Sequence, residues 1–361
     1  MDDQLDEVLK RYKDVETAAT GYIEDKKKGK KVEYIRDVLL PQLRTERAAV
    51  VLKIAQLKKK PPEKLFLPKW WIIVSSAGFR TVHLRDAQAT GESNKGAINS
   101  VTFFKSDYGD EGVFKETKDK IASPEQLGLR PSDEGYHAAK TEFDKAEEAK
   151  INLNDARQAE RSVAMYRLDQ LLDAGVIART EFALHHAGDG TIKKGTFMVK
   201  AQGQSAGALG KSGKYVKNAE DKKSAGGDKI DIQDPTLQRC LSRLQLIDAL
   251  AMQVDRHKGN YFIQYDENGK VLGVTGIDND LAFGEVTEVA KFVGEYPGIS
   301  KFVDKELAER IIALRDEQLV AVMEDLLSPG EINALLTRLH KLQEHLKKES
   351  TRLLAPDEWN E

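Results

Sequence analysis

Cysteine is nearly absent from this sequence: Cys240 is the single one among 361 residues. A lone cysteine excludes an internal disulfide and any metal site built from several thiolates. It fits a reducing compartment, and it also fits a cysteine-poor secreted protein. The sequence also lacks an excess of either charge, since 56 basic and 59 acidic residues leave a net charge of −3. This balance gives no general attraction to nucleic acid or to an anionic membrane.

Long hydrophobic runs are missing as well. No stretch approaches the roughly 20 apolar residues that a transmembrane helix needs. The N-terminus, MDDQLDEVLKRYKD, is charged from its first residues and has no signal-peptide core. We therefore expect no transmembrane segment, and a location in the cytoplasm or export by a route without such a signal. Apolar residues make up 40% of the chain, which is long enough for two or three lobes with a sizeable core.

Residues 1–62 are expected to form an N-terminal helical hairpin or arm. Apolar residues recur at three- and four-residue steps from Leu5 to Tyr22, and again from Val32 to Leu39. The lysine-rich run DKKKGKK separates the two stripes, and a pair of prolines at 61 and 62 marks the boundary. Two interpretations remain open: the hairpin packs against the main body, or it is a partner-binding or autoinhibitory arm, with an activating partner or ligand as its candidate.

Residues 63–202 are expected to form a mixed α/β lobe, with a short strand at 70–75. Val101, Phe103 and residues 113–115 have strand character, and SDYGDEG between them is a turn. A turn of small residues precedes this hairpin and contains Gly96, Asn99 and Ser100. Such a turn lets backbone N–H groups approach phosphates. A helix is expected over 152–174 with a stop near Gly175, followed by strands at 176–184 and 195–200.

Lys115 lies near the end of the second strand of that hairpin, beside apolar residues. Two roles are open for a lysine in this position. Its ammonium group can reach solvent from the edge of the sheet, or it can point inward and hold phosphate oxygens.

Residues 203–230 are rich in Gly, Ser and Lys, which is typical of a loop between lobes. Residues 231–361 are expected to form a mainly helical lobe. Its first helix starts at Pro235, is apolar nearly all round and is therefore buried. Strands at 261–264 and 271–277 follow, joined by the turn DENG. A helix is expected from about Lys305, and Ser328 with Glu331 forms a capping box that opens a last helix to about Leu353.

The polar residues around this second hairpin form the most informative cluster. Asp255, His257 and Asn260 lie between the buried helix and the hairpin, while Asp278 and Asp280 follow it. Two acids and an amide at the end of a β-ribbon can place a hydroxyl nucleophile and hold Mg²⁺ on the phosphates of a nucleotide. A salt-bridged loop without catalysis is the alternative. For Asp280, support of a second metal and capping of the turn both remain open.

Two motifs in this cluster carry a family resemblance. The motif D-R-H-x-x-N at residues 255–260 and the motif I-D-x-x-x-x-F at 277–283 resemble those of the atypical kinase superfamily. The most similar group includes phosphatidylinositol 3- and 4-kinases, actin-fragmin kinase and bacterial kinase-like effector proteins. KGAINSVTFF…GVFK is similar to the glycine-containing loop and lysine strand of that group. The resemblance covers roughly residues 90–310 and implies an α+β, two-lobed, protein-kinase-like fold with an added N-terminal helical hairpin.

The resemblance also implies roles for single residues. Asp255 would orient or deprotonate the attacking hydroxyl, and His257 would support the catalytic loop or the γ-phosphate. Asn260 and Asp278 would bind Mg²⁺, with Asp280 as a further candidate, and Lys115 would hold the α- and β-phosphates of ATP. The loop with Gly96, Asn99 and Ser100 would cover the phosphates.

One implied position departs from the pattern of the family. Its lobe-spanning helix often carries a glutamate that pairs with the nucleotide lysine, and the aligned place here lies near Ser162. The nearest glutamate, Glu160, is two residues away, a turn of about 200° on a helix. Glu160 is therefore the candidate partner of Lys115, with an orientation that can differ from that of the family.

We expect an ATP- and Mg²⁺-dependent phosphotransferase that transfers the γ-phosphate to a hydroxyl on a protein or a phosphoinositide. Three alternatives remain: a nucleotide-binding pseudokinase, a nucleotidyltransferase on the same fold, and a scaffold whose N-terminal helices or Lys-rich loop engage a partner. No nucleic acid is expected as a partner. Because the similar group includes bacterial effectors, the exported form would act inside a host cell.

Overall fold

The structure is a computed structural model of the chain. It describes residues 81–90, 94–95, 100–106, 109–117, 120–218, 220–222, 229–289, 302–323, 325–348 and 351–360. The expected helical hairpin at 1–62 and the expected strand at 70–75 lie outside the described residues. Within the described part, no helix is both long and apolar enough to cross a membrane.

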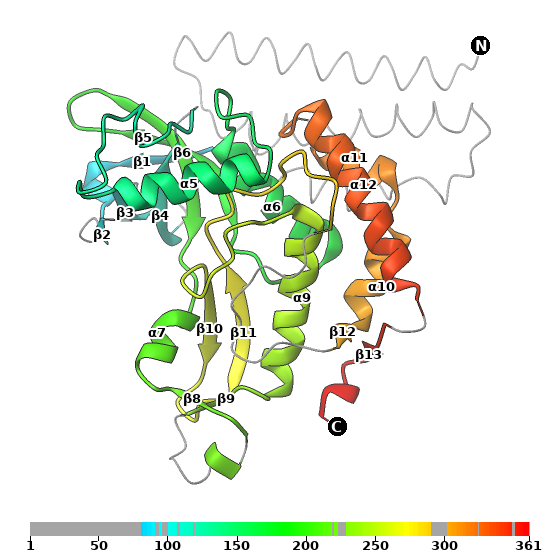
Figure 1. The fold of residues 1–361 in the computed structure, drawn as a ribbon. Helices are drawn as coiled ribbons and strands as arrows, with labels where there is room; N and C mark the ends of the chain where they lie inside the picture. Colours follow the sequence, from blue (N-terminus) through cyan, green and yellow to red (C-terminus); the bar gives the residue numbers. More distant parts are fainter. Residues whose placement is uncertain are drawn as a thin grey trace, which may run out of the picture.

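A six-stranded sheet forms the first lobe, with the strand order β1-β5-β6-β4-β3-β2 (Figure 1). Only the β1–β5 pairing in this sheet is parallel, and the other neighbours are antiparallel. The strands are β1 (Val82–Arg85), β2 (Asn94–Lys95), β3 (Ser100–Lys105), β4 (Glu111–Glu116), β5 (Thr180–His186) and β6 (Ile192–Val199). The expected hairpin around SDYGDEG is the β3–β4 pair, and β4 lies in the interior of the sheet between β3 and β6.

Two helices separate β4 from β5 in sequence: α5 (Tyr136–Glu148) and α6 (Gln158–Leu172). The sequence predicts α6 but starts it at residue 152, whereas the helix begins after Arg157, whose φ of 49° is left-handed. A left-handed Asp173 with φ 48° ends the helix shortly before Gly175. Helix α5 was not predicted from the sequence.

The segment expected to be a loop, 203–230, contains regular structure. It includes β7 (Gln204–Ser205), α7 (Ala206–Lys211) and β8 (Tyr215–Val216), and ends at β9 (Ile230–Asp231). The loop prediction is wrong for α7 because Ser205 caps that helix by accepting a hydrogen bond from the Ala208 N–H at 3.3 Å. Strand β7 then joins the second hairpin as the outer strand of a three-stranded sheet, β11-β10-β7.

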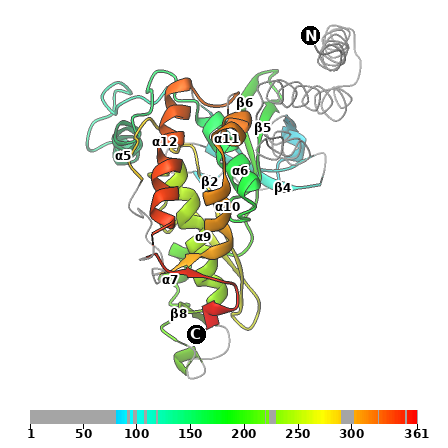
Figure 2. The same ribbon diagram turned by 90° about the vertical axis from the view of Figure 1, so that its right-hand side faces the viewer.

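The second lobe is mainly helical. Its elements are α9 (Pro235–Ala251), β10 (Tyr261–Tyr265), β11 (Val271–Gly276), β12 (Val303–Asp304), α10 (Lys305–Ala313), α11 (Asp316–Met323), α12 (Pro329–Leu346), β13 (Leu353–Leu354) and the short turn η4 (Glu358–Asn360). Figure 2 shows α12, α9 and α10 alongside one another, and these helices pack together. The predicted capping box of Ser328 and Glu331 is present at the start of α12. The helix ends before Leu353 because Leu353 and Leu354 pair with β12 instead.

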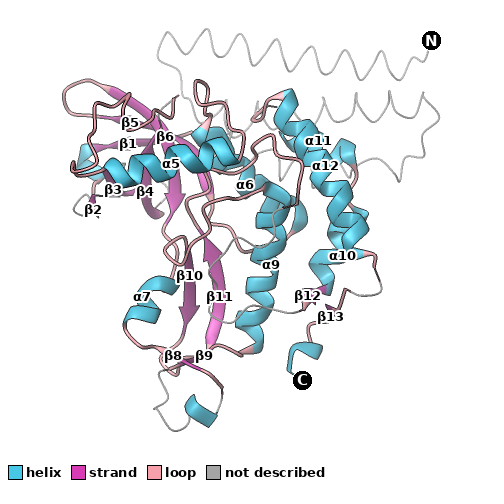
Figure 3. Cartoon of the chain, in the orientation of Figure 1, coloured by secondary structure: helices cyan, strands magenta, loops and turns pink. Residues whose placement is uncertain are grey.

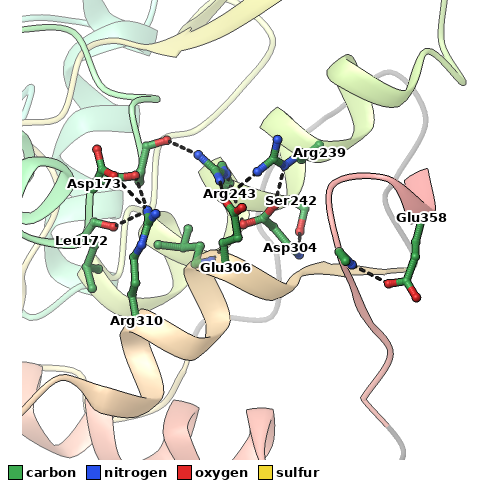
Figure 4. Close-up of polar contacts among 12 residues, drawn as sticks. Leu172, Asp173, Arg239, Ser242, Arg243, Asp304, Glu306, Arg310 and Glu358 are labelled. Atoms are coloured by element: carbon green, nitrogen blue, oxygen red, sulfur yellow. Dashed lines mark hydrogen bonds and ion pairs between the residues drawn. The ribbon is translucent and has the colours of Figure 1, made fainter. Parts of the chain in front are cut away.

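A polar cluster ties α9 to the start of α10 (Figure 4). Arg239 donates from Nε to Asp304 Oδ2 at 2.7 Å, and Arg243 Nε lies 3.1 Å from the other oxygen of that carboxylate. Both guanidinium groups also donate to Glu306 Oε2, at 2.8 and 2.9 Å. The carboxylate of Asp304 is completely buried, so these partners are what makes its burial tolerable.

Buried apolar residues form three separate clusters among the described residues. The largest lies under the helical lobe and includes side chains of α6, α9, α12 and the β10–β11 hairpin. A second, smaller cluster joins the end of α5 to the chain that follows α9. The third lies under the sheet and includes Phe104, Phe114 and Phe197.

The observed architecture confirms the α+β, two-lobed part of the predicted fold class. Figure 3 shows strands gathered in one sheet and one ribbon, with helices making up most of the other side. In the described residues, the mixed α/β lobe precedes the mainly helical lobe.

Candidate active site

A cavity of about 670 Å³ lies where the two lobes meet. The sheet contributes Phe103, Val113 and Lys115, and α6 contributes Ser162. Residues from α5 and from the loops that follow α9 and β11 complete the lining. The cavity therefore combines apolar side chains of the sheet with charged side chains of both lobes.

Strand β4 aims Lys115 into this cavity. Side chains alternate along a strand, so Val113 and Lys115 line the cavity while Phe114 between them is buried in the cluster under the sheet. Because β4 is paired on both sides, Lys115 is not an edge residue whose ammonium reaches past the sheet. The inward orientation, one of the two that the sequence left open, is the observed one.

The ammonium group of Lys115 contacts two acids of the other lobe. Its Nζ lies 2.5 Å from Asp278 Oδ1 and 2.7 Å from Asp280 Oδ2. Burial on its own would lower the pKa of Lys115, but the two aspartates outweigh it and raise that pKa above its usual value. Conversely, Lys115 lowers the pKa of Asp278, while burial raises the pKa of Asp280. The two carboxylates thus share one cation but have different environments.

The backbone at Asp278 adopts the left-handed conformation, with φ 55°. This conformation is uncommon for a residue other than glycine, although aspartate tolerates it better than most. It bends the chain directly after β11. The bend belongs to the loop in which Asp278 and Asp280 reach the same ammonium group.

Asp255 lies in the loop that connects α9 to β10, also at the cavity. Its Oδ1 forms an ion pair with Lys145 of α5. The Asn260 amide donates to the Asp255 carbonyl at 2.9 Å and lies 3.4 Å from Asp255 Oδ2. The backbone N–H of Asp255 donates to Gln253 at 3.0 Å. The carboxylate is therefore held from two sides.

His257 lies at the rim of the same loop, and 53% of its side chain is exposed. Its Nδ1 accepts the Gly259 N–H at 2.9 Å, and its Nε2 lies 3.9 Å from Asp255 Oδ1. The first contact closes the loop, in keeping with the expected supporting position. The second is too long for a hydrogen bond.

Arg256 joins the two motifs into one unit. Its side chain is 1% exposed and donates to both oxygens of Asp248 in α9, at 2.9 and 3.0 Å. It also donates at 2.6 Å to the carbonyls of Asn260 and Ile277 and to Asn279 Oδ1. The sequence motifs alone assigned no role to this arginine. Its position explains how residues far apart in the chain keep a fixed relation at the cavity.

The structure describes only part of the predicted phosphate-covering loop. Gly96 and Asn99 lie outside the described residues. The backbone of Ser100 begins β3 and pairs with Lys95, but its side chain is not described. The role of this loop therefore remains a prediction.

Glu160 lies on α6, but it is not among the residues that line the cavity, whereas Ser162 of the same helix is. The ion pairs of Lys115 are with Asp278 and Asp280. These positions give no support to a Lys115–Glu160 pair. The reason is helical geometry, because two residues along a helix point about 200° apart.

The functional residues that were not predicted from the sequence lie on α5. Lys145 contacts Asp255, and Glu142 lines the cavity while accepting a hydrogen bond from Gln158 Nε2 at 2.7 Å. A signal for this helix exists in YHAAKTEFDKAEE, which is rich in strong helix formers and has Tyr136, Ala139, Phe143 and Ala146 at three- and four-residue steps. No local pattern indicates that its lysine meets Asp255.

The acidic pair fits a small divalent cation. Asp278 and Asp280 both lie within 2.7 Å of one Nζ, so a cation near that position would meet both oxygens after a small shift. Magnesium prefers hard oxygen ligands at about 2.0–2.1 Å. No group of three or more His, Cys, Asp or Glu side chains in the described residues forms a metal site. A cation here would depend on water and phosphate oxygens for its remaining ligands. Asn260, the other predicted metal ligand, is not among the residues that line the cavity, and its amide donates to Asp255.

Comparisons with known proteins add two distant structures. No family model matches the sequence, and no curated protein matches it. A crystal structure of the Golgi casein kinase aligns with a TM-score of 0.42, and one of the same kinase with Mn/ADP bound aligns with 0.38. Both alignments have 12% sequence identity and include 76% of this chain. They include 74% and 75% of the respective kinase chains. Similarity at this level assigns the chain neither an activity nor a substrate.

Proposed function

We propose that this chain is an ATP- and Mg²⁺-dependent phosphotransferase of the atypical kinase type, with a hydroxyl on a protein or a phosphoinositide as acceptor. One observation carries the proposal: Lys115 of the sheet lobe meets Asp278 and Asp280 of the helical lobe in a cavity that Asp255 also lines. Phosphoryl transfer needs this combination of a cation for phosphates, oxygen ligands for a metal and a carboxylate for the nucleophile.

In this proposal the charge of each side chain determines which group of the substrates it contacts. Lys115 would leave the aspartates and hold the α- and β-phosphates of ATP, while Asp278, Asn260 and Asp280 would hold Mg²⁺. A metal held there would supply charge neutralisation for the phosphoryl group. Asp255 accepts the proton of the acceptor hydroxyl, and His257 keeps the loop around Asp255 closed. Positioning and charge neutralisation account for most of the catalysis in reactions of this kind.

The apolar part of the cavity suits a nucleotide base. Phe103 and Val113 from the sheet, Met198 from β6 and Phe262 from β10 line it. Flat apolar walls beside a few polar groups are typical of small-molecule sites. In the proposal, the adenine lies among these side chains and the phosphates point toward Lys115.

The test is turnover of ATP by the full chain, with Asp255→Asn and Asp278→Asn as variants and the exposed Asp316→Asn as a matched control. We expect the two site variants to lose activity by about 1000-fold, and the control to keep it. Equal turnover in the wild type and both site variants would end the proposal. The mass gained by the acceptor distinguishes transfer of phosphate from transfer of AMP.

A nucleotide-binding pseudokinase is the second candidate, and a specific contact favours it. The carboxylate of Asp255 is paired with Lys145, and Glu160 does not supply the usual partner of the nucleotide lysine. Calorimetry with ATP and Mg²⁺ separates the candidates, because a pseudokinase binds the nucleotide without turnover. A scaffold that acts through the N-terminal helices or the Lys-rich loop would bind no nucleotide. In either case we place the protein in the cytoplasm or, as an exported bacterial effector, in a host cell.

A further inference from the structure

Helix α5 presents one face to the cavity. The lining residues of this helix are spaced as one side of an α-helix is, and they are His137, Ala138, Thr141, Glu142 and Lys145. A different side of the helix carries an exposed pair, Lys140 with Asp144, in which each side chain is more than half exposed. Lys140 and Lys145 therefore lie on the same helix in two different environments.

The end of α5 is anchored directly beside the catalytic loop. Ala146 and Ala149 pack in one cluster with Val254, the residue before Asp255, and with Leu281 of the acidic loop. A Cβ on Gly284 would lie 1.8 Å from the Ala149 carbonyl oxygen, so the chain after α5 passes close to the chain after the acidic loop. This packing fixes the position from which Lys145 reaches the site.

Lys145 is the cation that contacts Asp255. The Lys145 side chain is 27% exposed and that of Asp255 is 21% exposed, so the contact is half-buried. His257, the other basic group near this carboxylate, is 53% exposed and 3.9 Å away. While Lys145 donates to Oδ1 of Asp255, this oxygen is a weaker acceptor for the proton of a hydroxyl.

We propose that Lys145 binds the γ-phosphoryl group of a nucleoside triphosphate and acts as a catalytic residue. This inference rests on the proposed function of the same cavity. A single ammonium group has three N–H donors and can move from a carboxylate to a phosphate without losing its charge. Asp255 and the γ-phosphate therefore compete for Lys145, and binding of the triphosphate frees the carboxylate.

The transfer step conserves atoms and charge. Lys145 breaks its contact with Asp255 and donates to an oxygen of the γ-phosphoryl group. The acceptor hydroxyl gives its proton to Asp255 while its oxygen forms a bond to phosphorus. The bond from phosphorus to the β,γ-bridging oxygen breaks, and the nucleoside diphosphate leaves with that electron pair. Lys145 stays protonated throughout and offsets the negative charge on the transferred group.

The test measures dissociation constants of the full chain for Mg-ADP and for a Mg-bound, non-hydrolysable ATP analogue with a β,γ-imido bridge. In Lys145→Met, we expect affinity for the analogue to fall by roughly 10-fold or more, with little change for ADP. Lys145→Arg should keep part of the preference for the triphosphate. Lys140→Met is the matched control on the outer face of α5 and should bind both nucleotides as the wild type does.

A second variant checks the competition itself. Asp255→Asn weakens the hold on Lys145, so it should tighten the ATP analogue but not ADP, and Lys145→Met in the same chain should remove the gain. If Lys145 only holds α5 in place, its replacement changes both affinities equally, and the proposal fails. The proposal also fails if the ratio of the analogue and ADP affinities stays constant in every variant.

Turnover separates this inference from the proposed function. Lys145→Met should lower kcat by about 100-fold, with partial recovery in Lys145→Arg. A chain that binds both nucleotides but transfers no phosphate overturns the phosphotransferase proposal, while the affinity ratio still decides the role of Lys145. A chain that binds neither nucleotide overturns both.

Discussion

The acidic and basic halves of the site come from regions with very different cores. The acidic loops follow α9 and β11, whose side chains belong to a cluster of 37 buried apolar residues in the described part of the chain. Lys115 lies on a strand whose own cluster has six such residues, and Lys145 lies at the end of a helix whose cluster has eight. The loop with Asp278 and Asp280 continues into the main core at Ala282 and Phe283, although Val254 and Leu281 pack in the cluster of eight with α5. Neither lysine lies on an element whose side chains belong to the main core.

The difference suggests which half can move. A small cluster buries little apolar area. The free energy needed to open an element packed only in such a cluster is therefore lower than for an element of a large core. Both lysines contact the acids directly, and in the proposed function they would leave them when phosphates and a metal bind. We therefore expect substitutions beneath the acids to act mainly on folding, and substitutions beneath the cations to act mainly on nucleotide affinity.

The largest expected effect is at Arg256, beneath the acids. Arg256→Met removes the guanidinium group that donates to the buried Asp248 carboxylate and to the carbonyls of Asn260 and Ile277, at a cost of about 3–5 kcal/mol in the free energy of unfolding. Urea unfolding of the full chain measures it, with the 82%-exposed Arg130→Met as control. A loss below 1 kcal/mol would show that the two motifs do not depend on this side chain.

Asp169 of α6 is a buried acid outside the cavity, on a helix whose apolar side chains belong to the large cluster. Burial raises its pKa to about 6, although the N–H groups of Val176 and Ile177 donate to its Oδ1. Because the pKa is higher in the folded than in the unfolded chain, this group makes the protein less stable as pH rises from about 4 to about 6.

Asp169→Asn keeps the acceptor oxygen and removes the charge. The variant should match the wild type at pH 3 and exceed it at pH 8 by up to about 3 kcal/mol, as a shift of about two pKa units requires. Unfolding free energies at the two pH values give the comparison. A stability difference that is the same at both would contradict the raised pKa.

A substitution at Gly195 of β6 tests the basic half of the site, because this residue lies against Lys115. A Cβ at this position would lie 2.1 Å from the Lys115 carbonyl oxygen and 2.9 Å from the Phe114 ring, so Gly195→Ala must displace β4. We expect ATP affinity to fall by about 10-fold while the protein loses only about 1–2 kcal/mol of stability. Gly273→Ala in β11 meets nothing within 4 Å and is the matched control. An unchanged affinity for ATP would show that Lys115 does not contribute to nucleotide binding.

The smallest effect is expected at an exposed pair of the helical lobe. Lys341 contacts Glu288 at 2.7 Å, but the two side chains are 41% and 77% exposed. Solvent screens such a pair, so Lys341→Met should change the unfolding free energy by less than about 0.5 kcal/mol. A larger loss in thermal or urea unfolding would mean that the helical lobe depends on its surface charges as well as on its core.

Local signals predicted much of this fold. The buried helix from Pro235, the hairpin around DENG and the capping box of Ser328 each depend on neighbours within a few residues, and each is present. Local signals failed at α7, since a glycine- and serine-rich composition outweighed a single cap. They also failed at the late start of α6, which depends on the left-handed backbone of Arg157.

Residues of the site could be predicted from the sequence only where known motifs follow one another in a recognisable order along the chain. Lys115 and Asp278 are 163 positions apart, and the expectation that both face one nucleotide site came from the family resemblance rather than from periodicity. Their direct ion pair was not predicted. The contact of Lys145 with Asp255 spans 110 positions and has no motif. Such contacts depend on how separate clusters pack together, which hydrophobic patterning does not specify.

The β10–β11 hairpin lies between the motif at 255–260 and the motif at 277–283. Its geometry determines which sequence pattern would identify relatives of this chain. The Ile277 N–H donates to the Asn260 carbonyl at 2.9 Å, and Tyr261 pairs with Gly276, so the motifs touch at the base of the ribbon. The ribbon turns back at its far end, away from that base. Adding or removing matched residues there would lengthen or shorten it without separating the motifs. A search pattern should therefore fix both motifs and let the interval between them vary.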